Sequence, residues 1–95
     1  MKFVLNKCYG GFGLSEKAKD ELKAKLNLKE FFDWEIARNN ETLIEIVERL
    51  GAEANGGFSD LKVVNIPDEN TDYNMDDYDG IETITYVLDG KLHYA

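Results

Sequence analysis

In the first half of the chain, the spacing of apolar residues fits a strand in some segments and a helix in others. Residues 2–8 carry apolar side chains on both faces of an extended segment, which is typical of a central strand covered on both sides. From Glu16 to about Leu26, apolar residues recur every four positions, and Ser15 stands where an N-cap belongs. This pattern predicts an amphipathic helix that follows the strand and a glycine-rich connection.

A second helical pattern, more strongly apolar than the first, occupies the middle of the chain. Either Asn39 or Asn40 can cap it, and it is expected to end between Gly51 and Gly57. Between the two helical patterns, aromatic and aliphatic residues alternate with acids over residues 31–37, which predicts a further strand.

The second half of the chain is typical of strands joined by turns. Residues 61–66 are apolar and β-branched, and Pro67 ends them. Residues 68–80 contain six acids and no base, which predicts an irregular acidic loop around a short strand near residues 73–75. The Asp89-Gly90 pair between residues 81–88 and 91–94 predicts a hairpin, because it supplies the positive φ values of a type I′ turn. The resulting order, β-α-β-α-β-β-β, predicts an α+β fold with two helices on a mixed sheet.

Length and composition predict one globular domain over residues 1–95. Two cores would leave each half too small to fold without disulfides, metal ions or oligomerisation, and 43% hydrophobic residues suit a folded chain. No run approaches the roughly 18 apolar residues that span a bilayer, and the opening residues stop short of a secretory segment. A cytoplasmic protein that contacts no membrane is therefore expected, and the single cysteine, Cys8, agrees with a reducing compartment.

Charge is distributed unevenly along the chain. Residues 1–38 carry a net charge of +2, and residues 39–95 carry −10. Affinity for nucleic acid requires clustered Lys and Arg, so direct binding of nucleic acid is disfavoured. An acidic surface favours a basic protein partner instead, although it can also serve only to keep the protein soluble.

The glycine-rich connection before the first helix is one candidate ligand site. Glycines allow backbone N–H groups to approach an anion, and a helix N-terminus adds partial positive charge, with Lys7 and Lys17 near in sequence. The dinucleotide and phosphate-loop motifs are both absent, so a simple tight turn is the alternative. The candidate residues for a small anionic ligand are Tyr9, Gly10, Gly11, Phe12, Gly13 and Ser15.

The acidic segment is a candidate partner-binding site. Its acids would face a basic groove of another protein, and its tyrosines would act as anchors. An EF-hand is excluded by its spacing, but an irregular cation site at Asp76, Asp77, Asp79 and Glu82 stays open as an alternative to a solvated loop. The candidate residues for partner binding are Tyr73, Asp76, Asp77, Tyr78, Asp79 and Glu82.

No catalytic, metal or cofactor site is predicted from the remaining residues. Cys8 is expected to be a small core residue, and His93, the only histidine, a surface or rim residue on an edge strand. One Cys and one His cannot supply the ligands of a zinc site, so the sequence predicts a non-enzymatic protein without a cofactor.

Three segments of the chain resemble a known group of proteins. They are VLNKCYGGFGLS at residues 4–15, LGAEANGGFSDLKVVNIPD at residues 50–68 and DYDGIE at residues 77–82. Together they look like a group of small uncharacterised proteins encoded by bacteriophages and prophages. The resemblance covers most of the chain and implies a bacterial cytoplasm and an accessory phage role, with no activity attached.

These observations leave three functions open. The first is a small acidic binding protein that acts on a host or defence component. The second is capture of a nucleotide-like anion at the glycine-rich connection, and the third is a structural or assembly role. A homodimer is compatible with all three, because exposed strand edges favour pairing.

Overall fold

The fold is an α+β arrangement, as the sequence predicts. The computed structural model describes residues 1–30, 36–67 and 71–95. The elements in chain order are β1 (Lys2–Asn6), α1 (Glu16–Leu26), α2 (Glu41–Leu50), the 3-10 helix η2 (Gly51–Ala54), β2 (Leu61–Asn65), β3 (Tyr73–Tyr78), β4 (Ile81–Leu88) and β5 (Lys91–Tyr94).

The described strands form two antiparallel sheets, where a single mixed sheet was expected. β1 pairs with β2, and β3, β4 and β5 form a second sheet in that order. Two-residue hairpins join β3 to β4 and β4 to β5, and a hairpin can only connect antiparallel strands. The strand predicted over residues 31–37 falls mainly on residues 31–35, which lie outside the described residues.

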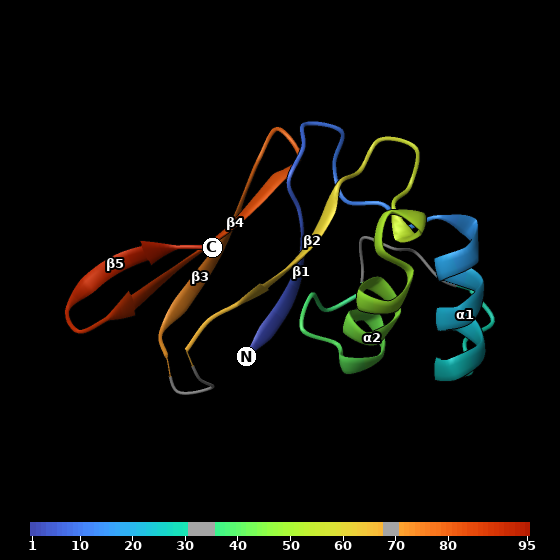
Figure 1. Ribbon diagram of the computed structural model, residues 1–95, viewed down its shortest axis with the longest axis horizontal. Coiled ribbons are helices and arrows are strands. Elements are labelled where there is room, and N and C mark those ends of the chain that lie inside the picture. The colour runs from blue at the N-terminus through green and yellow to red at the C-terminus, as the bar shows by residue number, and fades with distance from the viewer. Residues whose placement is uncertain (31–35, 68–70) are drawn as a thin grey trace.

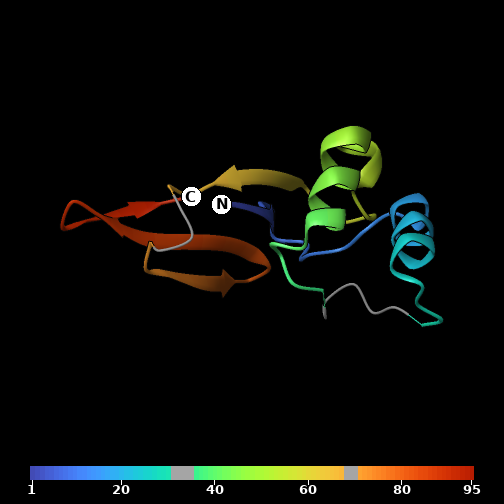
Figure 2. The ribbon, with the colours of Figure 1, turned by 90° about the horizontal axis from the view of Figure 1, so that it is seen from below.

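The β1–β2 sheet lies between the helices and the second sheet (Figures 1 and 2). Val4 belongs to a core cluster shared with both helices, whereas Phe3 and Leu5 pack with Ile66 and Ile84 on the opposite side. The expectation that the first strand is covered on both faces is therefore confirmed. One short strand, β1, contributes to both hydrophobic clusters that the described residues form.

Side-chain caps begin both helices where the sequence places them. The Ser15 hydroxyl accepts a hydrogen bond from the Ala18 N–H at 3.2 Å. Asn40, one of the two predicted caps, accepts from the N–H groups of Thr42 and Leu43. Such caps satisfy backbone donors that have no partner inside the helix.

The strand predicted near residues 73–75 of the acidic segment is confirmed, but it extends to Tyr78, so the prediction of an irregular loop is wrong for residues 76–78, and residues 68–70 lie outside the described residues. β3 pairs along all six of its residues with β4, and the turn between them is Asp79-Gly80, with φ values of 50° and 94°. The predicted Asp89-Gly90 turn has the same form, with φ values of 53° and 75°. Both pairs fit the left-handed positions of a type I′ turn. Because such a turn needs only two residues, Tyr78 at the end of β3 pairs directly with Ile81 at the start of β4.

Candidate functional site

Three connections meet at one edge of the molecule, which we call the loop end. They are the glycine loop (residues 8–13), the η2–β2 loop (residues 55–60) and the β3–β4 turn (residues 78–81), seen together along the upper edge of Figure 1. A Cβ on Gly10 would lie 1.7 Å from the Phe58 carbonyl oxygen, and one on Gly80 would lie 2.6 Å from the Gly11 nitrogen. Backbone contacts this close are open only to glycine, so the glycines join the three connections into one surface.

A single buried side chain, that of Asn6, is hydrogen-bonded to all three connections. Its Nδ2 donates to the carbonyl oxygens of Cys8 at 2.7 Å and Gly80 at 2.6 Å. Its Oδ1 accepts from the Asp60 N–H at 2.8 Å. Because Asn6 is fully buried at the end of β1, these bonds hold the loop end on the rigid core.

A buried ion pair lies next to Asn6. Arg38 Nη2 donates to Glu82 Oε2 at 2.8 Å, and Arg38 Nε lies 3.1 and 3.2 Å from the two Glu82 oxygens. Glu82 Oε1 also accepts from the Asn6 N–H at 3.0 Å, and the Arg38 guanidinium lies 3.6 Å from the centre of the Phe12 ring. The two charged side chains are only 10% and 6% exposed, so Glu82 is not available to a partner as the sequence suggested.

Lys7 is also turned inward and does not offer its charge to an anion. Its ammonium donates to the backbone oxygens of Glu82 and Ala95, each at 2.9 Å. Burial lowers the pKa of Lys7 below 10.5, and the nearby negative charge of Glu82 opposes that shift.

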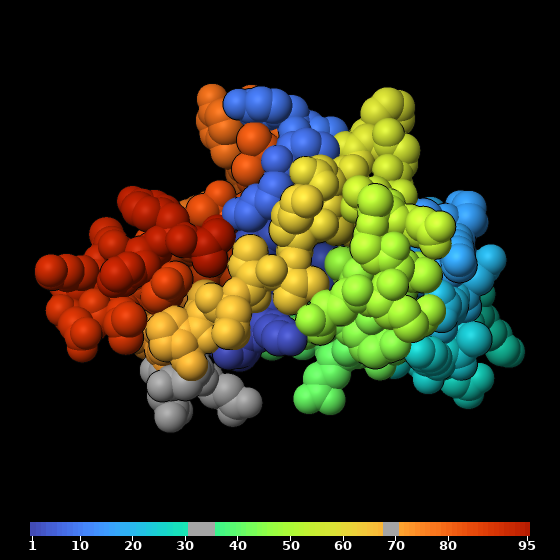
Figure 3. All heavy atoms as spheres, viewed as in Figure 1, coloured from blue at the N-terminus to red at the C-terminus, as the bar shows by residue number. Residues whose placement is uncertain are grey.

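Three aromatic side chains project from the loop end into solvent. Tyr9 is 71% exposed, Phe58 is 82% exposed and Tyr78 is 73% exposed. They come from the three different connections, and the space-filling view shows the first and last of these connections in contact at the top of the molecule (Figure 3). Exposed aromatic side chains on a fixed backbone are typical of protein-binding surfaces.

The predicted ligand residues are divided between the loop end and the start of α1. Tyr9, Gly10 and Gly11 belong to the loop end, and Gly11 has a φ of 89°. The Gly13 carbonyl accepts from the Gly56 N–H and the Ser59 hydroxyl, and Ser15 caps α1 and donates to the Glu53 carbonyl. Ser15 and the Ala18 N–H at the α1 N-terminus are therefore engaged within the fold.

The predicted partner-binding residues are divided between two faces of β3. Register with β4 places Tyr73 and Asp77 on the face toward β1, where the Tyr73 ring lies 5.1 Å from that of Phe3. Asp76 and Tyr78 lie on the opposite, uncovered face. All six strand residues are exposed.

The candidate cation site does not form in the part of the chain that the structure describes. No group of three or more His, Cys, Asp or Glu residues there is arranged to hold a metal ion. Cys8 is only partly buried, contrary to expectation, because β1 ends at Asn6, and its thiol donates to the Phe58 carbonyl at 3.0 Å. The His93 ring stacks on Tyr86 with 5.3 Å between ring centres.

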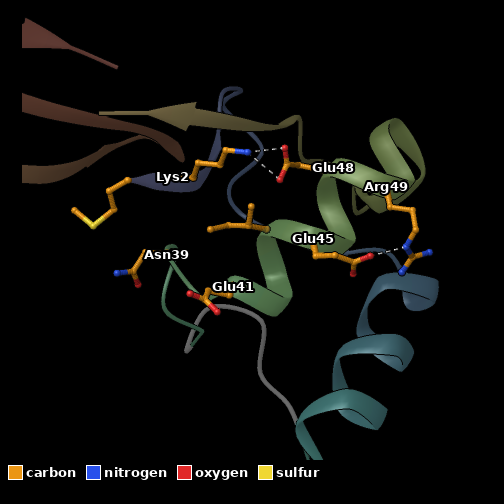
Figure 4. Close-up of a pocket in the computed structure, with 8 residues that line it drawn as sticks. Lys2, Asn39, Glu41, Glu45, Glu48 and Arg49 are labelled. Carbon is orange, nitrogen blue, oxygen red and sulfur yellow. Dashed lines mark hydrogen bonds and ion pairs between the residues drawn. The ribbon is translucent and has the colours of Figure 1, made fainter. Parts of the chain in front are cut away.

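An open groove of about 780 Å³ lies between the start of β1 and α2 (Figure 4). Four of the charged side chains beside it form two ion pairs, Lys2 with Glu48 at 3.1 Å and Arg49 with Glu45 at 2.9 Å. Hydrogen bonds from Arg49 and Lys25 lower the pKa of Glu45. The charges of Glu45 and Glu48 are thus balanced by neighbouring basic side chains.

No protein-family model, curated protein or solved structure matches this chain. Within the described residues, no helix has the length and hydrophobicity needed to cross a membrane. The loop end is the surface where sequence-predicted residues from two separate candidate sites, the glycine loop and the acidic segment, come together. Phe58, its third aromatic residue, was missed because a lone aromatic in a glycine-rich loop gives no periodic signal.

Proposed function

We propose that this chain is a non-enzymatic binding protein that docks onto another protein through its loop end. The observation that supports the proposal is the set of three exposed aromatic side chains on connections that Asn6 fixes to the core. Tyr9, Phe58 and Tyr78 would insert into apolar depressions of the partner, as the anchors of protein interfaces do.

Fixed loops favour such binding energetically. Ordering a mobile loop or a rotamer-rich side chain on association costs free energy that subtracts from affinity. Here the backbones that carry the anchors are already held by buried hydrogen bonds and by the close contacts at Gly10 and Gly80. Aromatic side chains also have few rotatable bonds, so their apolar area is buried at a small entropic cost.

The charge next to the loop end indicates a basic partner. No Lys or Arg occurs between Lys62 and Lys91, and Asp72, Asp76 and Asp79 lie on or beside β3. A field of one sign accelerates encounter with a surface of opposite sign and disfavours nucleic acid. The phage-like resemblance further supports a bacterial host or defence protein as the partner, met in the cytoplasm.

Native mass spectrometry on tagged protein recovered from a bacterial lysate tests this proposal. The test variant replaces Tyr9, Phe58 and Tyr78 with serine, and the matched control is Tyr94→Ser, whose side chain is equally exposed at 72% but lies on β5. We expect one host polypeptide at fixed stoichiometry with the wild type and the control, and about a tenfold lower bound fraction with the triple variant.

The same comparison can contradict the proposal in two ways. Equal retention of that polypeptide by the triple variant would show that the loop end is not the docking surface. Recovery of only a second copy of the chain would favour an assembly role.

Charge reversal at Asp76 and Asp79 should also weaken the salt dependence of partner binding. Asp77 is left intact in this variant, because its carboxylate accepts a hydrogen bond from the Gly80 N–H in the turn.

A further inference from the structure

β3 is an edge strand whose outer side meets no other strand among the described residues. It pairs only with β4, and every one of its six residues is exposed. Figure 2 shows β3 at the lower margin of its sheet, with β4 on its other side. It contains no proline, bulge or lysine, which are common means of protecting such an edge.

The register identifies which backbone groups of β3 face outward. Hydrogen-bonded pairs alternate along antiparallel strands, and the Val87 N–H donates to the Asp72 carbonyl. Counting in steps of two places Asn74, Asp76 and Tyr78 in hydrogen-bonded pairs with β4. The N–H and C=O groups that point away from β4 therefore belong to Tyr73, Met75 and Asp77.

Charge determines which strand this edge can accept. Asp76 and Asp77 lie within β3, and Asp72 and Asp79 flank it, without a compensating base on the strand. A second copy of β3 would bring these acids against each other, whereas a strand bearing lysine or arginine would pair with them. A hollow of about 420 Å³ on the uncovered face, lined by residues that include Asp76, Val87 and Leu92, adjoins the strand.

We infer that the protein accepts an extended, basic segment of its partner as a fourth strand beside β3. Main-chain hydrogen bonds at Tyr73, Met75 and Asp77 would provide affinity, and alternate lysine or arginine side chains on the uncovered face would meet Asp72 and Asp76. β3 leads directly into the loop end at Tyr78, so the same partner would continue onto the aromatic anchors. This inference rests on the proposed function for the identity of the partner as a basic protein.

Residue-resolved amide hydrogen exchange with a defined peptide tests the inference. The probe is a capped peptide of about four lysine–valine repeats, the length that an edge strand of this size can pair. We expect exchange at Tyr73, Met75 and Asp77 to slow by about tenfold, with little change at Asn74 and Asp76, which are already bonded to β4. A glutamate–valine peptide should have no effect.

Two controls separate strand addition from general charge attraction. The same basic peptide, N-methylated at every residue, keeps its charge but cannot form the ladder along either edge, so it should not protect these amides. In the protein, Met75→Pro removes an outward N–H that the sheet does not use and should abolish protection, whereas Asn74→Pro should destabilise the hairpin. Should Met75→Pro not fold, the N-methylated peptide alone decides the question.

The outcomes also separate this inference from the proposed function. Equal protection by the basic and N-methylated peptides, or no selective protection, would overturn strand addition even if the loop-end triple variant loses its partner. Protection that persists in the triple variant, together with unchanged partner retention by that variant, would support the strand-binding edge and refute the loop end as the docking surface.

Discussion

Replacing Asn6 with alanine tests the main internal support of the loop end. The substitution removes one side chain that bonds to the Cys8 and Gly80 carbonyls and the Asp60 N–H. It leaves the backbone N–H of residue 6 free to keep its bond to Glu82. The change therefore isolates the side-chain contacts from the neighbouring ion pair.

The expected loss follows from the number of hydrogen bonds. Each intramolecular hydrogen bond contributes about 1 kcal/mol net, and a buried group left without a partner costs about 1–3 kcal/mol. Three such bonds give a loss of about 3 kcal/mol, and the vacated volume adds to it. A domain of this length has a free energy of unfolding of roughly 5–14 kcal/mol, so the variant should still fold but with a clearly lower free energy of unfolding.

Urea unfolding of the wild type, Asn6→Ala and the exposed control Asn74→Ala measures this loss. We expect a lower midpoint with an unchanged slope for Asn6→Ala, and a change within about 0.5 kcal/mol for the control. Amide exchange at Asp60 should accelerate in parallel, because its N–H loses its acceptor. A loss below about 1 kcal/mol would refute the view that Asn6 holds the three connections together.

Two further predictions concern the same region. Gly10→Ala should lower the free energy of unfolding by at least about 2 kcal/mol in thermal unfolding, because its Cβ would overlap the Phe58 carbonyl. The control Gly57→Ala should be tolerated, because a Cβ at Gly57 meets nothing within 4 Å. Equal effects of the two variants would be inconsistent with this packing. Lys7 has a lowered pKa when folded, so between that value and 10.5 the unfolded chain binds more protons, and wild-type stability should rise with pH relative to Lys7→Met. A pH-independent difference in urea midpoints would contradict it.

Local signals in the sequence were sufficient for the helices and for one hairpin. Ser15 and Asn40 cap the helices as predicted, and Asp89-Gly90 forms the expected turn. These features depend on neighbours within a few residues, which the sequence displays directly. The same Asp-Gly signal at residues 79–80 could have identified the β3–β4 turn, but the density of acids around it favoured a loop.

Contacts between distant segments could not be predicted in this way. Glu82 looks like one more acid of an exposed segment, yet it is buried against Arg38, 44 residues earlier. Asn6 bonds to Gly80 across 74 residues, and only the fold reveals why Gly10 and Gly80 must be glycines. Charge and residue type alone therefore assigned Glu82 to the surface and gave Asn6 no role.

Hydrogen exchange on the complex is the measurement that tests the central claim most directly. The protein is compared alone and bound to the host polypeptide retained in the lysate experiment, with protection followed along the whole chain. The account predicts slower exchange at residues 8–11, 57–60 and 77–80 together, because the three connections form one docking surface. Protection confined to α1 and α2, with the loop end unchanged, would contradict it.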